Sequence, residues 1–351
     1  MTTSPPDFML NRPGALIAAL PAVLGFVPEK SLVLVTLARG QLGAVMRVDL
    51  SMPMTDTLAH LAEVAAAAQP DAAIVVIIDS DGAECPLCAE DFDRLTDDLS
   101  QALAGHRISL IAAHVVDRIA AGGRWHCADN CGAAGTVDDP AASPLAMAAV
   151  LDGRRLYTCR QELQDVIAPV DLARCERLAG LIAARLDLAA EDPVRHGGDK
   201  RAGRRVRQAM AAAARVAGGA QLSDDELVEL AFALTDPRVR DMLYALAVGD
   251  HAAEAEALWG ALSRALPDPW RVEPLVLLAF SAYARGDGPL AGVALEAALR
   301  GNGDHRMAGM LDTALQSGLR PERIRELAGT GYRLAARLGV RLPRQQTPRA
   351  R

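Results

Sequence analysis

Acidic side chains that follow apolar runs are the residues of this sequence best suited to catalysis or metal binding. Asp49 ends an alternating run, Asp79 and Asp81 follow the run AIVVII, and Asp117 follows ISLIAAHVV. Open α/β sheets bind ligands beyond the carboxyl ends of their strands, where these carboxylates would gather. Such a group would suit a hard cation such as magnesium, although Asp and Gly are also common turn residues at strand ends.

Two further residues extend this candidate site. Arg47 lies two positions before Asp49, so both side chains share one face of an extended strand. The pair is either a solvent-side ion pair of little energetic value or one edge of a site. His114 lies inside an apolar run, where it is either a hydrogen-bonded core histidine or a catalytic base. The candidate catalytic residues are Asp49, Asp79, Asp81, His114, Asp117 and Arg47.

Four cysteines form two close pairs that suggest a metal site. Cys85 and Cys88 are separated by two residues, and Cys127 and Cys131 by three. Thiolates at such spacing can share a tetrahedral zinc ion, but a predicted helix and strand separate the pairs. A redox-active pair and inert thiols are the alternatives. We therefore predict no cofactor. Any metal bound would be zinc at the cysteines or magnesium at the strand-end carboxylates.

The elements that must position these residues alternate between helix and strand in the N-terminal half. Leu16, Ile17, Leu20 and Leu24 recur at helical spacing after Asn11, a plausible N-cap. A hairpin of Ser31–Ala38 and Gln41–Leu50 follows, with Leu42 and Met46 expected on one face. The remaining predicted elements are helices at Thr55–Ala68 and Glu90–Ala104, strands at Ala73–Ile78 and Ile108–Val116, and an edge strand near Trp125. This order predicts an α/β domain with a mixed sheet flanked by helices.

The C-terminal half is predicted to be all-helical. Ser223 and Glu226 form a capping box, and the segment Leu278–Leu299 resembles a tetratricopeptide repeat with its turn at Gly286-Asp287. The basic helix Lys200–Arg215 presents either a solvated face or a surface for an anionic partner. The predicted division is an α/β domain at 1–150, connecting helices at 151–222, a helical-repeat-like domain at 223–338 and a disordered basic tail at 339–351.

Composition excludes several classes of protein. The formal net charge of −7 and the aromatic content of 3% argue against nucleic-acid binding. Proteins that bind nucleic acids are usually basic and stack bases on aromatic side chains. No apolar run approaches the roughly 20 residues that span a bilayer, and Pro21 interrupts the run Ala15–Phe26 that resembles a signal peptide. We therefore expect a cytoplasmic protein that does not enter the membrane.

Several segments resemble an actinobacterial family known as domain of unknown function 4192. They are LPAVLGFVPEKSLVLV, MRVDL, LWGALSRALPDPWRVEPLVLLAFSAYARGDGPLAGVALEAAL and RMAGMLDTALQSGL. Members typically carry Trp, Cys, a Cys-Cys-Pro run and Gly after the N-terminal sheet, which Trp125, Cys127, Cys131 and Gly135 resemble. Gly132 follows Cys131 here, which weakens a metal or redox role based on that motif. The resemblance implies no activity, cofactor or catalytic residues.

Two functions follow from these observations. The favoured one is a non-enzymatic interaction or regulatory protein that binds a protein partner through its helical C-terminal half. The alternative is a hydrolase, or an enzyme that binds a small ligand or metal, with its site at the strand ends of the α/β domain. The alternative requires Asp49, Asp79, Asp81, His114 and Asp117 to converge around one pocket.

Overall fold

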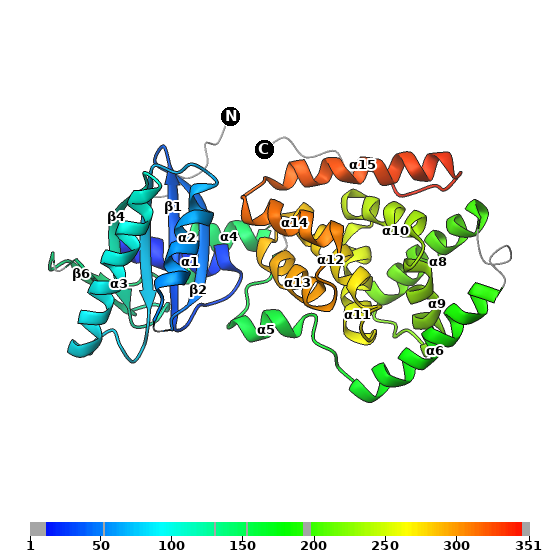
Figure 1. Cartoon of the computed structure of the whole chain (residues 1–351), viewed down its shortest axis with the longest axis horizontal. Coiled ribbons are helices and arrows are strands. Elements are labelled where there is room, and N and C mark those ends of the chain that lie inside the picture. The colour runs from blue at the N-terminus through cyan, green and yellow to red at the C-terminus, as the bar shows by residue number, and fades with distance from the viewer. Residues whose placement is uncertain (1–11, 52, 130, 152–153, 192–197, 346–351) are drawn as a thin grey trace. The chain divides into compact units, whose positions relative to one another are not determined.

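The structure is a computed structural model that describes residues 12–51, 53–129, 131–151, 154–191 and 198–345. The chain divides into two compact units, Met1–Glu162 and Leu163–Arg351, which are described separately here (Figure 1). Asn11, the predicted N-cap, lies outside the described residues, as do residues 192–197 and 346–351.

The described part of unit 1 contains a mixed sheet of six strands, as the sequence predicts. The strand order is β2-β1-β3-β4-β5-β6; β3 and β4 pair in parallel, and the other neighbours are antiparallel. The strands are β1 (Ser31–Ala38), β2 (Gln41–Asp49), β3 (Ala72–Ile78), β4 (Ser109–Val116), β5 (Arg124–Cys127) and β6 (Ala134–Thr136).

Helices cover both faces of this sheet (Figure 1). One face packs against α2 (Thr55–Ala66) and α3 (Pro86–Gly105), and the other packs against α1 (Pro13–Leu24). Because β1 and β3 lie between two apolar layers, their continuous runs of Val, Leu and Ile are buried on both sides. Unit 1 also contains the 3-10 helix η1 (Pro140–Ala142) and α4 (Pro144–Leu151), and α5 (Arg160–Asp165) crosses the boundary between the units.

The predicted alternation along β2 is wrong at one residue. The pairing of β1 with β2 shifts between Val35 and Leu37, where β2 carries one extra residue. This bulge moves Leu42 to the face that packs against α1, whereas Met46 packs on the α2 and α3 side. Gly43 permits the close pairing there, because a Cβ atom at this position would lie 2.7 Å from the hydroxyl of Thr36.

Unit 2 is helical, in agreement with the sequence. Its helices are α6 (Leu172–Glu191), α8 (Asp199–Ala217), α9 (Asp224–Leu234), α10 (Pro237–Leu243), η2 (Tyr244–Val248, 3-10), α11 (Ala252–Ala265), α12 (Val272–Arg285), α13 (Gly288–Gly301), α14 (Arg306–Gln316) and α15 (Pro321–Arg337). The capping box of Ser223 and Glu226 is present at the start of α9. Helix α12 is the most buried of them, with twelve of its fourteen residues buried. Apolar side chains therefore surround the axis of this helix.

Residues 340–345 correct the prediction of a disordered tail. Val340 is buried, the Tyr332 hydroxyl donates to the Pro343 carbonyl over 3.0 Å, and Gln345 pairs with Gly249. The basic composition of this segment indicated disorder, but its backbone finds partners on the loop after η2. Among the described residues, no helix combines the length and the apolar character needed to cross a membrane.

Candidate functional site

The sheet register brings the candidate carboxylates to one edge. Ser31 pairs with both Asp49 and Ile78, and Ile78 pairs with Val116. Asp49, Asp79 and Asp117 therefore end or follow β2, β3 and β4 at the same end of the sheet, with β1 between β2 and β3. Their side chains nevertheless find separate partners.

Asp117 organises its own turn. Its Oδ1 atom accepts hydrogen bonds from the backbone N–H groups of Arg118 over 2.6 Å and of Arg124 over 2.8 Å. Its Oδ2 atom accepts a third bond from the Arg118 guanidinium at 2.9 Å. These contacts connect the end of β4 to the start of β5, so this carboxylate closes a turn.

Arg47 and Asp49 form an ion pair with 2.6 Å between Nη2 and Oδ1. The Arg47 Nε atom also donates to the Ser31 hydroxyl over 2.8 Å, and its guanidinium lies 6.0 Å from the ring centre of Phe26. Arg47 is thus held against the sheet, while the Asp49 side chain is 71% exposed. An exposed carboxylate beside one arginine is a surface ion pair of small energetic value.

Asp79 and Asp81 are engaged in the loop after β3. The Asp81 N–H donates to Oδ1 of Asp79 over 3.1 Å, which forms an Asx-type turn. Asp81 forms an ion pair with Lys30 at 3.0 Å, and the hydrogen bond and charge of Lys30 lower the pKa of Asp81. The strand-end carboxylates are therefore divided among local contacts.

Cys88 and Cys127, one from each cysteine pair, lie on opposite faces of the sheet. Cys88 packs against the core formed with α2 and α3. Cys127 pairs with His114 on β4, and its Sγ atom lies 3.6 Å from Nδ1 of His114. The His114 ring meets Trp125 edge-to-face at 5.2 Å, and Trp125 packs against the core on the α1 side. The structure therefore does not bring Cys85 and Cys88 together with Cys127 and Cys131.

Within the described part of the chain, one group of three potential metal ligands is assembled. The ligand atoms of Cys127, Asp129 and Cys131 all lie within 4.8 Å of one another. The Cys131 N–H donates to Oδ1 of Asp129 over 3.2 Å. Burial, followed by hydrogen bonding with Cys131, raises the pKa of Cys127 to about 12, and hydrogen bonds from Cys131 lower the pKa of Asp129. Without a metal, Cys127 is therefore a neutral thiol beside a carboxylate, and it would release its proton on binding one.

His114 lies beside this group and contacts Cys127, but its ring nitrogens are not within 4.8 Å of all three ligand atoms. It is only 4% exposed, and burial lowers its pKa against the opposing charge of Asp129. The imidazole is thus neutral near pH 7, the form that binds metals. The structure places the buried His114 beside Cys127, whereas the sequence left it open between a hydrogen-bonded core histidine and a base of the carboxylate site. Asp129 was missed, although the alternating spacing Cys127-x-Asp129-x-Cys131 was a visible signal.

Trp125 and Gly135 form the adjacent cross-strand pair of β5 and β6. A Cβ atom at position 135 would lie 3.1 Å from three atoms of the Trp125 ring. Glycine therefore lets the indole lie directly over the β6 backbone, where it also contacts His114. This packing gives the Trp and Gly of the sequence motif a structural role next to the cysteines.

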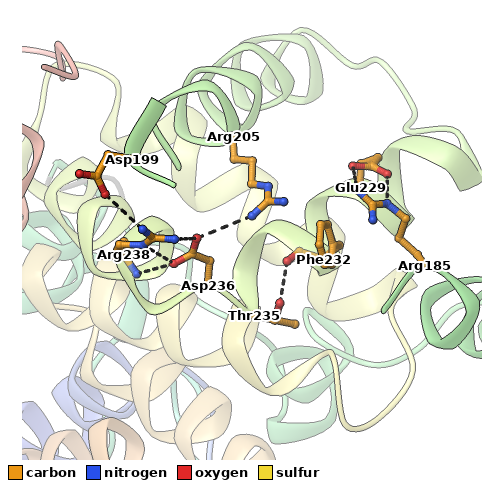
Figure 2. Close-up of polar contacts among 8 residues, drawn as sticks. All are labelled: Arg185, Asp199, Arg205, Glu229, Phe232, Thr235, Asp236 and Arg238. Carbon is orange, nitrogen blue, oxygen red and sulfur yellow. Dashed lines mark hydrogen bonds and ion pairs between the residues drawn. The ribbon is translucent and has the colours of Figure 1, made fainter. Parts of the chain in front are cut away.

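In unit 2, two arginines flank one aromatic ring (Figure 2). The guanidinium carbons of Arg185 on α6 and Arg205 on α8 lie 3.9 Å and 4.4 Å from the ring centre of Phe232 on α9. Glu229 pairs with Arg185 at 2.6 Å. Burial lowers the pKa of Arg205, and the nearby charge of Asp236 opposes that shift. The three helices are joined through this arrangement, which we call the Phe232 cluster.

Asp236 continues the Phe232 cluster toward α10. Its Oδ2 atom lies 3.6 Å from Arg205 and 2.9 Å from Arg238 (Figure 2). Burial would raise the pKa of Asp236, but the hydrogen bonds from Arg238 outweigh it and lower that pKa. Arg238 also reaches Asp199 at 3.1 Å. Arg205, which the sequence placed on a basic helix, therefore points inward to carboxylate and ring partners.

Comparison with known proteins gives one match. The family model described as "Domain of unknown function (DUF4192)" matches residues 13–322, which confirms the family resemblance seen in the sequence. No curated protein and no solved structure matches the chain. Because the family model covers both the sheet of unit 1 and most of the helices of unit 2, the chain belongs to the DUF4192 family.

Proposed function

We propose that this chain is a non-enzymatic, cytoplasmic interaction protein whose helical unit 2 binds a partner protein. One observation supports this proposal most: an apolar stripe on α6 that faces solvent. Leu181 is 48% exposed and Leu188 is 59% exposed. With the exposed Ala184 they recur at steps of three and four residues, which places them along one line of the helix. We call these three residues the α6 stripe.

The α6 stripe lies beside the part of the helix that unit 2 buries. Cys175, Leu178 and Ile182 are buried, and α6 packs mainly against α9. The leucines of the stripe therefore have no role in the described core of unit 2. Spacing of three and four residues is that of a helix seam, in which a second helix places its own apolar side chains.

Charge identifies the occupant more closely. Glu176, Asp187 and Glu191 are exposed and follow one edge of the α6 stripe. A partner helix with apolar residues on one face and Lys or Arg along the adjoining edge would complement both features. We therefore propose an amphipathic, basic-edged helix of another protein as the ligand of α6.

The tetratricopeptide-like interpretation of the helical half is also a proposal. Its support is the helix pair α12 and α13, which are joined by a left-handed Gly286 and an Asp287 whose side chain accepts from the Leu290 N–H over 3.1 Å. Since α12 is almost fully buried, binding would use outer helices such as α6.

Affinity capture with matched variants tests the proposed function. The bait is the full chain in an actinobacterial host, the group to which the sequence resemblance points. Leu181→Glu/Leu188→Glu changes the α6 stripe, and Met310→Glu, at a site 62% exposed on α14, is the control. We expect the same partner with wild type and control, and at least about tenfold less with the α6 variant. Equal recovery by all three proteins would contradict the proposal.

A further inference from the structure

We propose that Cys127, Asp129 and Cys131 bind a structural zinc ion at the β5–β6 edge of unit 1, and that the ring of His114, which contacts Cys127, moves in as the fourth ligand. The chemistry of the donors supports this assignment. Two thiolates with an imidazole favour zinc over the hard cations magnesium and calcium, and a carboxylate is an accepted fourth zinc ligand. The inference concerns unit 1 and does not depend on the partner proposed for unit 2.

One distance already agrees with tetrahedral coordination. With Zn–S of about 2.3 Å and Zn–N of about 2.0 Å, a tetrahedral ion holds sulfur and nitrogen about 3.6 Å apart. Sγ of Cys127 and Nδ1 of His114 lie 3.6 Å apart. The ligand atoms of Cys127, Asp129 and Cys131 lie within 4.8 Å of one another, so contraction by about 1 Å would bring these three to coordination distance. The His114 ring lies outside this group and must also approach Asp129 and Cys131 to complete the set.

The location explains why a metal would be useful there. β5 has four residues and β6 has three, and neither strand has a fully buried residue. Short edge strands with little apolar burial are weakly held. An ion bound to His114 of β4 and to Cys127, Asp129 and Cys131 would fasten the β5–β6 hairpin to the sheet. Four protein donors leave no open coordination position, which is the arrangement of structural zinc sites.

Metal analysis of the full-length protein tests this inference. The protein is purified under reducing conditions without chelator, and bound zinc is measured by mass spectrometry. The metal-free protein is then titrated with cobalt(II), whose absorption reports tetrahedral thiolate coordination. We expect about one zinc per chain, and the Cys85→Ser/Cys88→Ser control should retain it. Cys127→Ser/Cys131→Ser should bind at least about 100-fold more weakly, and His114→Gln at least about tenfold more weakly.

Three results would overturn the zinc site. The first is less than about a tenth of an equivalent of zinc in wild type after zinc is supplied. The second is metal retained by Cys127→Ser/Cys131→Ser, and the third is equal loss in the Cys85→Ser/Cys88→Ser control. Cys131→Ser alone guards against misfolding, because the Cys131 side chain is exposed. This single variant should keep the wild-type circular dichroism spectrum while losing the cobalt charge-transfer bands.

Discussion

Replacing Phe232 by Leu measures how strongly the two guanidinium groups hold unit 2 together. Phe232 is 6% exposed, and Leu keeps an apolar side chain at this site while removing the ring face. Each cation–π contact at a partly desolvated site contributes about 0.5–2 kcal/mol, so the loss of both is about 2 kcal/mol. Imperfect packing of Leu adds less than about 1.5 kcal/mol. We expect Phe232→Leu to lower the free energy of unfolding by about 2–3.5 kcal/mol.

Urea denaturation followed by circular dichroism gives the measurement. Phe92→Leu is the control, because Phe92 is 7% exposed and lies in the apolar core of α2 and α3. It should cost less than about 1.5 kcal/mol. A double-mutant cycle of Phe232→Leu with Arg205→Met isolates one contact, with an expected coupling of about 1 kcal/mol. A coupling below about 0.3 kcal/mol, or equal costs for both Phe variants, would refute the reasoning.

Two further predictions concern packing and pH. Gly331→Ala should destabilise unit 2 by about 1–3 kcal/mol, because the new Cβ would lie 2.7 Å from the Asp241 carbonyl oxygen. Gly309→Ala should stabilise unit 2 by up to about 1 kcal/mol, because no atom lies within 4 Å of the new Cβ. Urea midpoints in the opposite order would contradict this packing. Burial would raise the pKa of Glu273, but His305 and Arg240 outweigh it and lower that pKa. Its stabilisation is therefore complete above the unfolded pKa of about 4.3 and is lost as pH falls through the lower folded pKa. Glu273→Gln should be less stable than wild type at pH 7, and this difference in unfolding free energy should shrink below about pH 4. A difference that grows on acidification would be inconsistent with the lowered pKa of Glu273.

The sequence predicted those elements whose signals are local. Such signals and the structure that they specify involve the same few residues of the chain. Examples are the apolar runs of β1 and β3, the capping box at Ser223 and the turn at Gly286. The face of Leu42 could not be predicted, because it depends on a bulge that appears only when β2 pairs with β1. The unexpected order of residues 340–345 likewise depends on contacts with Gly249, about ninety residues away.

The candidate site was harder to predict than the fold. Strand ends located Asp49, Asp79 and Asp117 at one edge, but only side-chain geometry shows that local partners engage each of them. The separation of the cysteine pairs depends on tertiary structure, because α3, which begins beside Cys85, covers one face of the sheet and Cys127 of β5 lies on the other. The inward direction of Arg205 had a readable signal, because it lies three residues after Ala202 and four before Ala209, both of which are buried.

Site-specific photo-crosslinking tests the central claim, that unit 2 binds a partner helix along α6, most directly. A photoreactive residue replaces Leu181 in the full chain, expressed in the host, and a second protein carries it at Met310 as the control. We predict one discrete crosslink from position 181 to a basic-edged helix of a single other protein, and its loss when Leu188→Glu is added. Crosslinks at 181 no stronger than those at 310, or a product containing two copies of this chain, would contradict the claim.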